Sequence, residues 1–321
     1  MSPSCPIHIL LCTDSRYAPH CGVTATSALE NAGGLPVEIH IFTDSLTAED
    51  TLRFKSLERK YDCHINIKVI SGQCVDRLPK NIKRWPPSSF MRLLAAELLP
   101  ADIHRVIYLN CDTAVDTPLQ PLWQTQLGRN MCAVVPDGPD DIPNKLYKAT
   151  LDISSTYFNS GVMVLDLDLL RENGIFTQAL NMLKTSGDAF KCPDQDVLNL
   201  LIDGKALYLP IHYNIQSSHL LQNRPPLPIS DEHTVRNILR RRSPLIIHYT
   251  SEFKPWACNI NHWHPLRSVW HRYRRKSPWH DRSPLSWRTR FAIWRLSAAY
   301  RLLQPGRLRA YGSDFFAKKC F

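Results

Sequence analysis

VIYLNCDTAV, residues Val106–Val115, is the most informative stretch of this sequence. Its four apolar residues lead directly into Asn110, Cys111 and Asp112, and a short apolar run that ends in polar residues is typical of a buried strand in a parallel sheet. Open α/β sheets bind ligands at the carboxyl ends of such strands. Because side chains at positions i and i+2 of an extended segment point to the same side, Asn110 and Asp112 could share a divalent cation such as Mg²⁺ or Mn²⁺. The simpler alternative is a strand followed by a polar turn.

Strand and helix patterns alternate on the N-terminal side of this stretch. The strands are predicted at Ile7–Cys12, Val37–Phe42 and Ile65–Ile70. The helices between them are predicted from Pro19 to Gly33 and over Leu46–Tyr61. A proline early and a glycine late in a helix is the usual asymmetry. The alternation of strands with helices predicts βαβ units and a parallel sheet.

The pattern continues on the C-terminal side. A helix is predicted at Phe90–Leu99, where Pro100 stops it. Further strands are predicted at Cys132–Val135, Thr156–Leu167, Ala206–Leu209 and Leu245–His248, and further helices at Leu169–Leu183 and from Cys192 onward. The polar segment Asp137–Ile153 is a candidate mobile loop over a site, and Gln222–Pro228 is a proline-rich loop.

The composition is that of an ordinary globular protein, with 44% hydrophobic and 21% charged residues. No apolar stretch approaches the ~18 residues that a membrane-spanning helix needs. The apolar run Ile7–Leu11 lacks the basic residues that precede the apolar core of a signal peptide. The ten cysteines show no CxxC pair or zinc-like spacing, so we expect reduced thiols in the cytoplasm. Cys111 is accordingly expected to be a small spacer and not a nucleophile.

The positive charge is concentrated in the C-terminal region. Residues 265–321 contain 14 Lys and Arg against 2 Asp and Glu, a net charge of +12, whereas residues 1–264 contain 25 against 27, a net charge of −2. We therefore divide the chain into a body, residues 1–264, and a basic, aromatic C-terminal region, residues 265–321. Such asymmetry indicates an anionic partner, either a membrane or a nucleic acid.

Tryptophans recur at near-regular intervals through this end of the chain. They are Trp263, Trp270, Trp279, Trp287 and Trp294. On a helical wheel of Trp287–Leu303, two apolar stripes form, and arginines flank the first of them. One stripe could pack on the body while the other meets lipid and the arginines reach the headgroups. A solvated basic helix, or a helix that only caps the core, is the alternative.

Six short motifs with functional residue types occur in order along the body. They are Asp14-x-x-Tyr17, Arg92, Asn110-x-Asp112, Asn159-x-Gly161, Asp194-Gln195-Asp196, and His248 followed by Lys254-Pro255-Trp256. Together they resemble glycosyltransferase family 8 and, within it, the bacterial lipopolysaccharide galactosyl- and glucosyltransferases. The resemblance covers Ile7–Trp256, and its most specific parts are HYTSxxKPW, DQDVLN and FNSGV. It implies a GT-A type fold, a Rossmann-like α/β domain that binds a nucleotide sugar at the C-terminal edge of its strands.

The resemblance implies metal-assisted transfer from a UDP-hexose. A cation, Mn²⁺ or Mg²⁺, would be held by Asn110, Asp112 and His248 and would stabilise the departing diphosphate as a Lewis acid. Lys254 would supply a positive charge to the pyrophosphate. The first acidic position of the family's D-x-D motif is Asn110 in this chain. The site therefore lacks one negative charge, and we expect weaker metal affinity.

The same resemblance implies how the donor is held. Asp14 and Tyr17 match positions that bind uracil, and the positions around the donor hexose are Arg92, Asn159, Asp194 and Gln195. Further donor-binding positions are Thr13, Cys111, Ser160 and Ser251, the last of which is often glycine in relatives. Family members retain the anomeric configuration without an agreed pair of carboxylates like that of retaining hydrolases. The expected catalytic residues, Asp194 and Gln195, are therefore assigned to positioning and charge stabilisation.

We therefore expect a retaining hexosyltransferase that moves galactose or glucose from UDP to a lipopolysaccharide, lipooligosaccharide or other lipid-linked glycan. It would work at the cytoplasmic face of the inner membrane, attached peripherally through its C-terminal region. A nucleotide-sugar-binding protein with little transferase activity is one alternative, based on Asn110, but Asp112, His248 and Lys254 are intact. A nucleic-acid-binding protein is another, but the body has no recognised nucleic-acid module and the tryptophans suit a membrane interface better.

Overall fold

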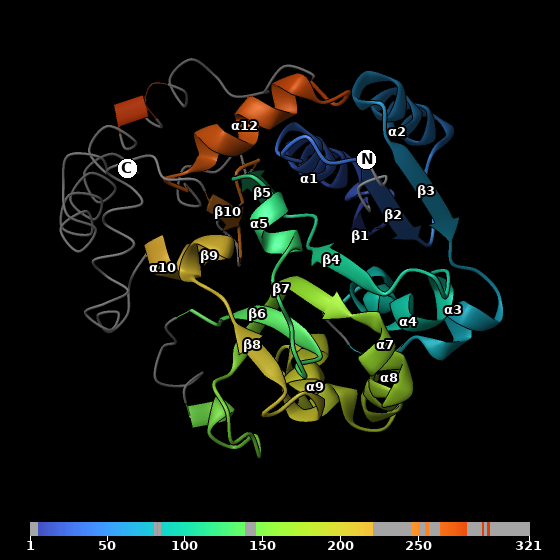
Figure 1. The fold of residues 1–321 in the computed structure, drawn as a ribbon, viewed down its shortest axis with the longest axis vertical. Helices are drawn as coiled ribbons and strands as arrows, with labels where there is room; N and C mark the ends of the chain where they lie inside the picture. Colours follow the sequence, from blue (N-terminus) through green and yellow to red (C-terminus); the bar gives the residue numbers. More distant parts are fainter. Residues whose placement is uncertain are drawn as a thin grey trace, which may run out of the picture.

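The computed structural model describes residues 6–79, 82, 85–138, 146–220, 245–250, 254–256, 264–280, 291 and 294–295. Within these residues, a seven-stranded sheet in the order β3-β2-β1-β4-β7-β6-β8 forms the centre of the molecule (Figure 1). Its strands are β1 (Ile7–Thr13), β2 (Val37–Thr43), β3 (His64–Val69), β4 (Arg105–Leu109), β6 (Cys132–Pro136), β7 (Phe158–Asp166) and β8 (Ala206–Tyr208). The predicted α/β class is confirmed.

The half of the sheet that contains β3, β2, β1 and β4 is parallel, as the alternation of strands and helices predicted. The helix α1 (Ala18–Glu30) connects β1 to β2, and α2 (Ala48–Tyr61) connects β2 to β3. Parallel pairing places the carboxyl ends of β1 and β4 at the same edge of the sheet. The residues that end or follow these two strands, Thr13 and Asp14 on one and 110–112 on the other, therefore lie at that edge.

The other half of the sheet departs from the predicted parallel arrangement. The strand β7 runs antiparallel to both β4 and β6, whereas β6 is parallel to β8. Eight of the nine residues of β7 are buried, and a strand that is buried along nearly its whole length carries no sign of its direction. The reversal brings the start of β7 to the end of β4, where the Asn110 N–H donates to the Gly161 carbonyl at 2.8 Å.

A small second sheet adds a histidine to this edge. It contains β5 (Thr113–Asp116), β10 (Leu245–His248) and β9 (Ile215–Gln216), in the order β5-β10-β9. The strand β10 is antiparallel to β5, and its last residue, His248, pairs with Thr113. Because Thr113 directly follows Asp112, the pairing places the late histidine beside the end of β4. The strands β5 and β9 were not predicted, since four and two residues are too short to show a periodicity.

Helices cover both faces of the central sheet, as a buried sheet requires. One face packs against α1 and α2, and the other against η1 (Pro87–Leu94), α7 (Leu167–Glu172), α8 (Ile175–Ser186) and α9 (Pro193–Leu201). The remaining described helices on the body are short: α3 (Gln73–Arg77), α4 (Ala95–Leu98), α5 (Gln120–Trp123), α10 (Ser217–Leu220), η2 (Gly187–Ala189) and η3 (Ile211–Tyr213).

Two predicted helices are interrupted. The segment Phe90–Leu99 was predicted as one helix and consists of the end of the 3₁₀ helix η1 followed by α4. The segment Leu169–Leu183 spans the end of α7 and most of α8, with a break at Gly174. Gly174 has φ = 59°, a left-handed conformation that glycine adopts without the cost of a Cβ clash. The helix predicted from Cys192 onward is confirmed as α9.

The helix α12 (Arg267–Lys276) packs the first part of the C-terminal region onto the body. Trp270 and Trp279 are 1% and 2% exposed, and Trp279 donates from Nε1 to Asp50 Oδ1 at 3.0 Å. Gly22 of α1 makes room for this ring, since a Cβ on Gly22 would lie 2.0 Å from it. These two tryptophans are therefore core residues, and the expectation that they contact a membrane is wrong.

Several expectations concern residues outside the described ones. These residues are Ser251, Trp263, Gln222–Pro228, 139–145 of the predicted loop Asp137–Ile153, and most of Trp287–Leu303. Within that last range, Phe291 and Trp294 are helical and 54% and 64% exposed, and their rings stack with centroids 5.8 Å apart. Among the described residues, no helix combines the length and the apolar character needed to cross a membrane.

Candidate active site

The predicted site residues that the structure describes gather at one edge of the central sheet. They come from the end of β1, from η1, from the turn between β4 and β5, from the start of β7, from α9, and from the end of β10 and the segment after it (Figure 1). Polar contacts join nine of them into one network: Arg92, Asn110, Asp112, Asn159, Ser160, Asp194, Gln195, His248 and Lys254.

Asp112 lies between two basic side chains. Lys254 Nζ is 2.5 Å from its Oδ2, and His248 Nε2 is 3.2 Å from its Oδ1. Burial alone would raise the pKa of the Asp112 carboxyl, but the neighbouring Lys254 ammonium opposes burial, and this pKa lies well below its usual range. Lys254 is fixed in turn by donating to the Tyr249 carbonyl at 2.6 Å. Asp112 is therefore a permanent anion at the sheet edge.

The ring of His248 presents one nitrogen to this anion. Its Nδ1 lies 3.0 Å from Asn159 Oδ1, an oxygen that also accepts the backbone N–H of Gly161 at 3.0 Å. Since Asn159 Oδ1 is an acceptor, the proton of the neutral imidazole belongs on Nδ1. The lone pair of Nε2 then faces Asp112 Oδ1 across 3.2 Å. Two electron-rich atoms at this distance fit a cation held between them.

Asn110 stands at the third position of the expected cation site. Its Nδ2 lies 3.2 Å from His248 Nε2, while its Oδ1 accepts the Tyr108 hydroxyl at 2.8 Å and lies 3.5 Å from Arg92 Nη2. A half-turn of this amide would direct Oδ1 toward His248 and Asp112. The side chains of Asn110, Asp112 and His248 therefore fit a divalent cation with two oxygen ligands and one nitrogen ligand.

A buried ion pair forms the other half of the network. Arg92 and Asp194 are 4% and 5% exposed and are in direct contact. Arg92 also donates from Nη1 to the Ser160 carbonyl at 2.6 Å, and its guanidinium carbon lies 4.3 Å from the centroid of the Tyr108 ring. A buried pair with additional hydrogen bonds is costly to break from one side, so Asp194 is held in one position.

Gln195, the next residue of α9, is fixed at both ends of its amide. Its Oε1 accepts the backbone N–H of Ser160 at 3.0 Å, and its Nε2 donates to the Tyr157 hydroxyl at 3.2 Å. The Tyr157 hydroxyl donates onward to Asp196, which is fully buried and also accepts the Tyr147 hydroxyl at 2.7 Å. The orientation of Gln195 is therefore set by a second layer of hydrogen bonds.

Asp137 and Tyr157 belong to this network but were not predicted as site residues. Asp137 Oδ1 accepts Asn159 Nδ2 at 2.9 Å, and Lys148 Nζ lies 2.5 Å from Asp137 Oδ2. Both residues act across long sequence separations, which no local pattern reveals. Asp196, by contrast, stands in the quoted DQD motif, so that its support of Gln195 through Tyr157 could have been suspected.

The expected uracil-binding residues lie at the end of β1. Asp14 Oδ1 accepts the Tyr17 N–H at 2.9 Å, and the Thr13 hydroxyl donates to the Asp14 carbonyl at 3.0 Å. The Tyr17 ring is 38% exposed and meets the Trp256 ring edge-on at a centroid distance of 5.9 Å. An exposed ring held in this way can stack on a base. Cys111 is buried and its thiol is hydrogen-bonded to a backbone carbonyl of β1, as a spacer would be.

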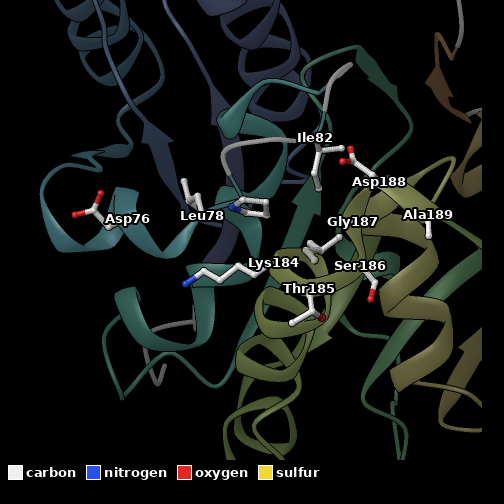
Figure 2. Close-up of a pocket in the computed structure, with 11 residues that line it drawn as sticks. Asp76, Leu78, Ile82, Lys184, Thr185, Ser186, Gly187, Asp188 and Ala189 are labelled. Carbon is white, nitrogen blue, oxygen red and sulfur yellow. The ribbon is translucent and has the colours of Figure 1, made fainter.

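A cavity of about 690 Å³ lies apart from these residues, between the segment around α3 and the end of α8 (Figure 2). It is lined by Asp76, Leu78, Pro79, Ile82 and residues 183–189. Ile82 closes over Gly187, where a Cβ would lie 2.5 Å from its Cδ1. None of the predicted site residues lines this cavity, so it is a place distinct from the network described above.

The sequence matches the family model described as Glycosyl transferase family 8 over residues 8–259. The lipopolysaccharide 1,2-glucosyltransferase of Escherichia coli (strain K12) is 28% identical over 275 residues, which cover 84% of this chain and 78% of that protein. The lipopolysaccharide 1,3-galactosyltransferase of Salmonella typhimurium (strain LT2) is also 28% identical over 275 residues, which cover 83% of this chain and 77% of that protein.

Solved structures share the fold. The galactosyltransferase LgtC, in complex with donor and acceptor sugar analogs, superposes with a TM-score of 0.68 at 21% identity, covering 89% of this chain and 100% of that chain. The WbbM bifunctional glycosyltransferase superposes with a TM-score of 0.70 at 18% identity, covering 92% of this chain and 52% of that chain. The expected GT-A type fold is confirmed.

Proposed function

Because this chain belongs to glycosyltransferase family 8, we propose that it transfers galactose or glucose from a UDP-sugar to a lipopolysaccharide or lipooligosaccharide, with retention and with a divalent cation. Membership of the family makes the protein a glycosyltransferase. Two relatives at 28% identity are named for glucosyl and galactosyl transfer to lipopolysaccharide. These names support the choice of hexose and of acceptor class.

The 3.2 Å approach of His248 Nε2 to Asp112 Oδ1, with Nδ1 of the same ring directed at the Asn159 Oδ1 acceptor, is the observation that carries the proposal. A bound Mn²⁺ or Mg²⁺ would act as a Lewis acid on the donor diphosphate, an effect worth several kcal/mol in the transition state. Asp112 and His248 would hold this cation, together with the amide oxygen of Asn110. Lys254, already 2.5 Å from Asp112, would give the diphosphate a charge-assisted hydrogen bond.

Asp194 and Gln195 would act on the donor sugar. Positive charge develops at the anomeric carbon as its bond to UDP breaks, and oxygen atoms fixed in advance near that carbon stabilise the charge. Arg92 fixes the Asp194 carboxylate, and Ser160 and Tyr157 fix the Gln195 amide. In the mechanism we propose, the acceptor hydroxyl attacks from the face that UDP leaves, and a departing phosphate oxygen takes the acceptor proton. Asp14 and Tyr17 would hold the uracil.

We also propose that residues 1–264 form the catalytic domain and that residues 265–321 attach it to the cytoplasmic face of the membrane. Residues 281–321 carry a net charge of +7 out of the +12 of residues 265–321, and this charge supports the attachment, because each basic residue near an anionic bilayer contributes about 1 kcal/mol. The exposed, stacked rings of Phe291 and Trp294 supply apolar contact area. Since α12 packs on the body, the contact would come from residues beyond α12.

A transfer assay with isotopically labelled donors tests the proposed reaction. UDP-galactose and UDP-glucose are each incubated with Mn²⁺ and a truncated lipooligosaccharide, and the product is analysed by NMR. We expect one of the two hexoses in the product, with the α configuration of the donor. A β-linked product would contradict retention. Tight donor binding with no labelled product from any acceptor would instead favour a nucleotide-sugar-binding protein, which the gathered Asp112, His248, Lys254 and Asp194 argue against.

A further inference from the structure

A second group of ligand-type side chains lies at the opposite end of the sheet from the donor site. His8 is the second residue of β1, and Glu38 and His40 are in β2, the neighbouring strand (Figure 1). In the parallel register, His8 pairs with Glu38, and His40 pairs with Leu10. Since residues two apart on a strand share a face, all three side chains project from the same face of the sheet.

The three side chains meet at distances that suit one metal ion. His8 Nδ1 lies 3.3 Å from His40 Nε2 and 3.5 Å from Glu38 Oε2, and His40 Nε2 lies 4.0 Å from Glu38 Oε1. Among the described residues, this is the one group of three His, Cys, Asp or Glu side chains whose ligand atoms all lie this close together. Tetrahedral zinc with bonds near 2.0–2.1 Å places its ligand atoms about 3.3 Å apart.

The surroundings of these side chains suit metal binding as well. Burial lowers the pKa of both imidazoles, that of His40 to about 4, so that the rings are neutral at pH 7 and offer lone pairs. Without a metal, there is room for only one proton between His8 Nδ1 and His40 Nε2. That proton is used in the contact between the two rings, so Glu38 receives no hydrogen bond from an imidazole. Asn66 donates from Nδ2 to Glu38 Oε1 at 2.5 Å, as outer partners of a metal-bound carboxylate do.

We propose that His8, Glu38 and His40 form a zinc-binding site that is separate from the cation site of the transferase reaction. Two imidazoles and one carboxylate favour Zn²⁺ over Mg²⁺ or Ca²⁺, which prefer oxygen ligands. The Glu38 side chain is 27% exposed, so a water can occupy the fourth position. The metal would tie β1 to β2. Six residues of extended chain, about 20 Å, separate His8 from Asp14, so the bound zinc lies too far away to touch the donor.

Zinc titration of the full-length chain tests this site. The protein carries no polyhistidine tag, is stripped with a chelator, and is titrated with Zn²⁺ against a chromophoric competitor. All measurements use an Asp112→Asn background, which disables the cation site at the other edge. We expect one equivalent of Zn²⁺ to bind, and a visible spectrum typical of tetrahedral coordination when Co²⁺ replaces Zn²⁺.

Variants of the three ligands identify the site. We expect His40→Ala to weaken Zn²⁺ binding at least a hundredfold, and Glu38→Gln, which keeps the size of the side chain, at least tenfold. His104→Ala is the matched control, because His104 is an exposed histidine paired with Asp168, and it should leave the affinity unchanged. Two results would overturn the proposal: the Asp112→Asn protein binds no equivalent of Zn²⁺, or Glu38→Gln in that background binds Zn²⁺ as tightly as the Asp112→Asn protein itself. Both tests remain valid even if His40→Ala fails to fold.

Discussion

Asn110 is the residue at which the expected cation site has an amide in place of a carboxylate. Asn110→Asp would add a negative charge within about 3 Å of His248 Nε2, and the affinity of hard cations rises with the charge of their ligands. We expect the Mn²⁺ concentration that gives half-maximal UDP release to fall about tenfold, whereas Asn110→Ala should raise it. A metal titration of the two variants checks this, and identical curves for wild type and Asn110→Asp would remove Asn110 from the site.

The Arg92–Asp194 pair allows a prediction about stability as well as activity. Arg92→Met leaves the Asp194 carboxylate buried without its partner, so we expect the free energy of unfolding to fall by about 3–5 kcal/mol. In Arg92→Met/Asp194→Leu neither charge remains, and most of this loss should be recovered while transfer stays absent. Urea denaturation measures both variants. A double variant no more stable than Arg92→Met alone would show that the pair is not the source of the loss.

At the scale of the elements, the close approach of β7 to β10 sets the position of His248. A Cβ on Gly161 would lie 2.1 Å from His248 Cε1, so Gly161→Ala must displace the ring from Asp112. We expect kcat/KM to fall about a hundredfold, as for a reacting group misplaced by an ångström, with an unchanged circular dichroism spectrum. In a His248→Ala background the same substitution should cost no further activity. A further large loss there would place the effect elsewhere in β7.

The elements also show which parts of the fold a sequence can predict. The apolar segments of β1, β2 and β3 alternate along the chain with the helical patterns of α1 and α2, so this half of the sheet could be predicted from local patterns. The direction of β7 did not, because eight buried residues in a row fit either direction. The same reversal brings Asn159 and Ser160 to Arg92 and Gln195, so the site network depends on a pairing that the residues of β7 alone do not specify.

At the scale of the whole molecule, α12 and the Trp279 ring pack on the body and extend the folded core beyond residue 264. Trp279→Ala removes a buried ring that fills the space above Gly22 and donates to Asp50, and we expect a loss of about 3–5 kcal/mol in the free energy of unfolding. Trp279→Phe should lose less, since most of the buried area remains. Thermal and urea denaturation check both. A wild-type stability for Trp279→Ala would mean that the Trp279 ring does not anchor the segment after α12 to the body.

Truncation separates the packed part of the C-terminal region from the remainder. Deleting residues 281–321 keeps α12 and both buried tryptophans, and it removes the net charge of +7 that this segment carries. We expect the truncated protein to keep its melting temperature and its activity on a soluble acceptor, but to lose binding to anionic vesicles, with neutral vesicles as the control. Undiminished binding to anionic vesicles after the deletion would contradict membrane attachment through this segment.

Nine predicted site residues form one polar network. They were carried over, position by position, from the resemblance to glycosyltransferase family 8, and such a transfer does not depend on strand directions. Asp137, Tyr157 and the His8–Glu38–His40 group were missed for a different reason. Their contacts depend on the register of strands and on segments far apart in the sequence, which composition and periodicity do not encode. Trp270 and Trp279 were misjudged because tryptophans at near-regular intervals among arginines were interpreted as typical of a membrane interface, whereas both rings are buried.

The most direct test of the proposed function is UDP release from a panel of UDP-sugars, with Mn²⁺ and after chelation, with water or a glycan as acceptor. We predict turnover of UDP-galactose or UDP-glucose that requires the metal. Asp112→Asn should lose this turnover, because Asp112 is the permanent anion of the site. Absence of UDP binding by the intact protein, or release that is unchanged by chelation and by Asp112→Asn, would contradict a metal-assisted UDP-hexose site at this edge of the sheet.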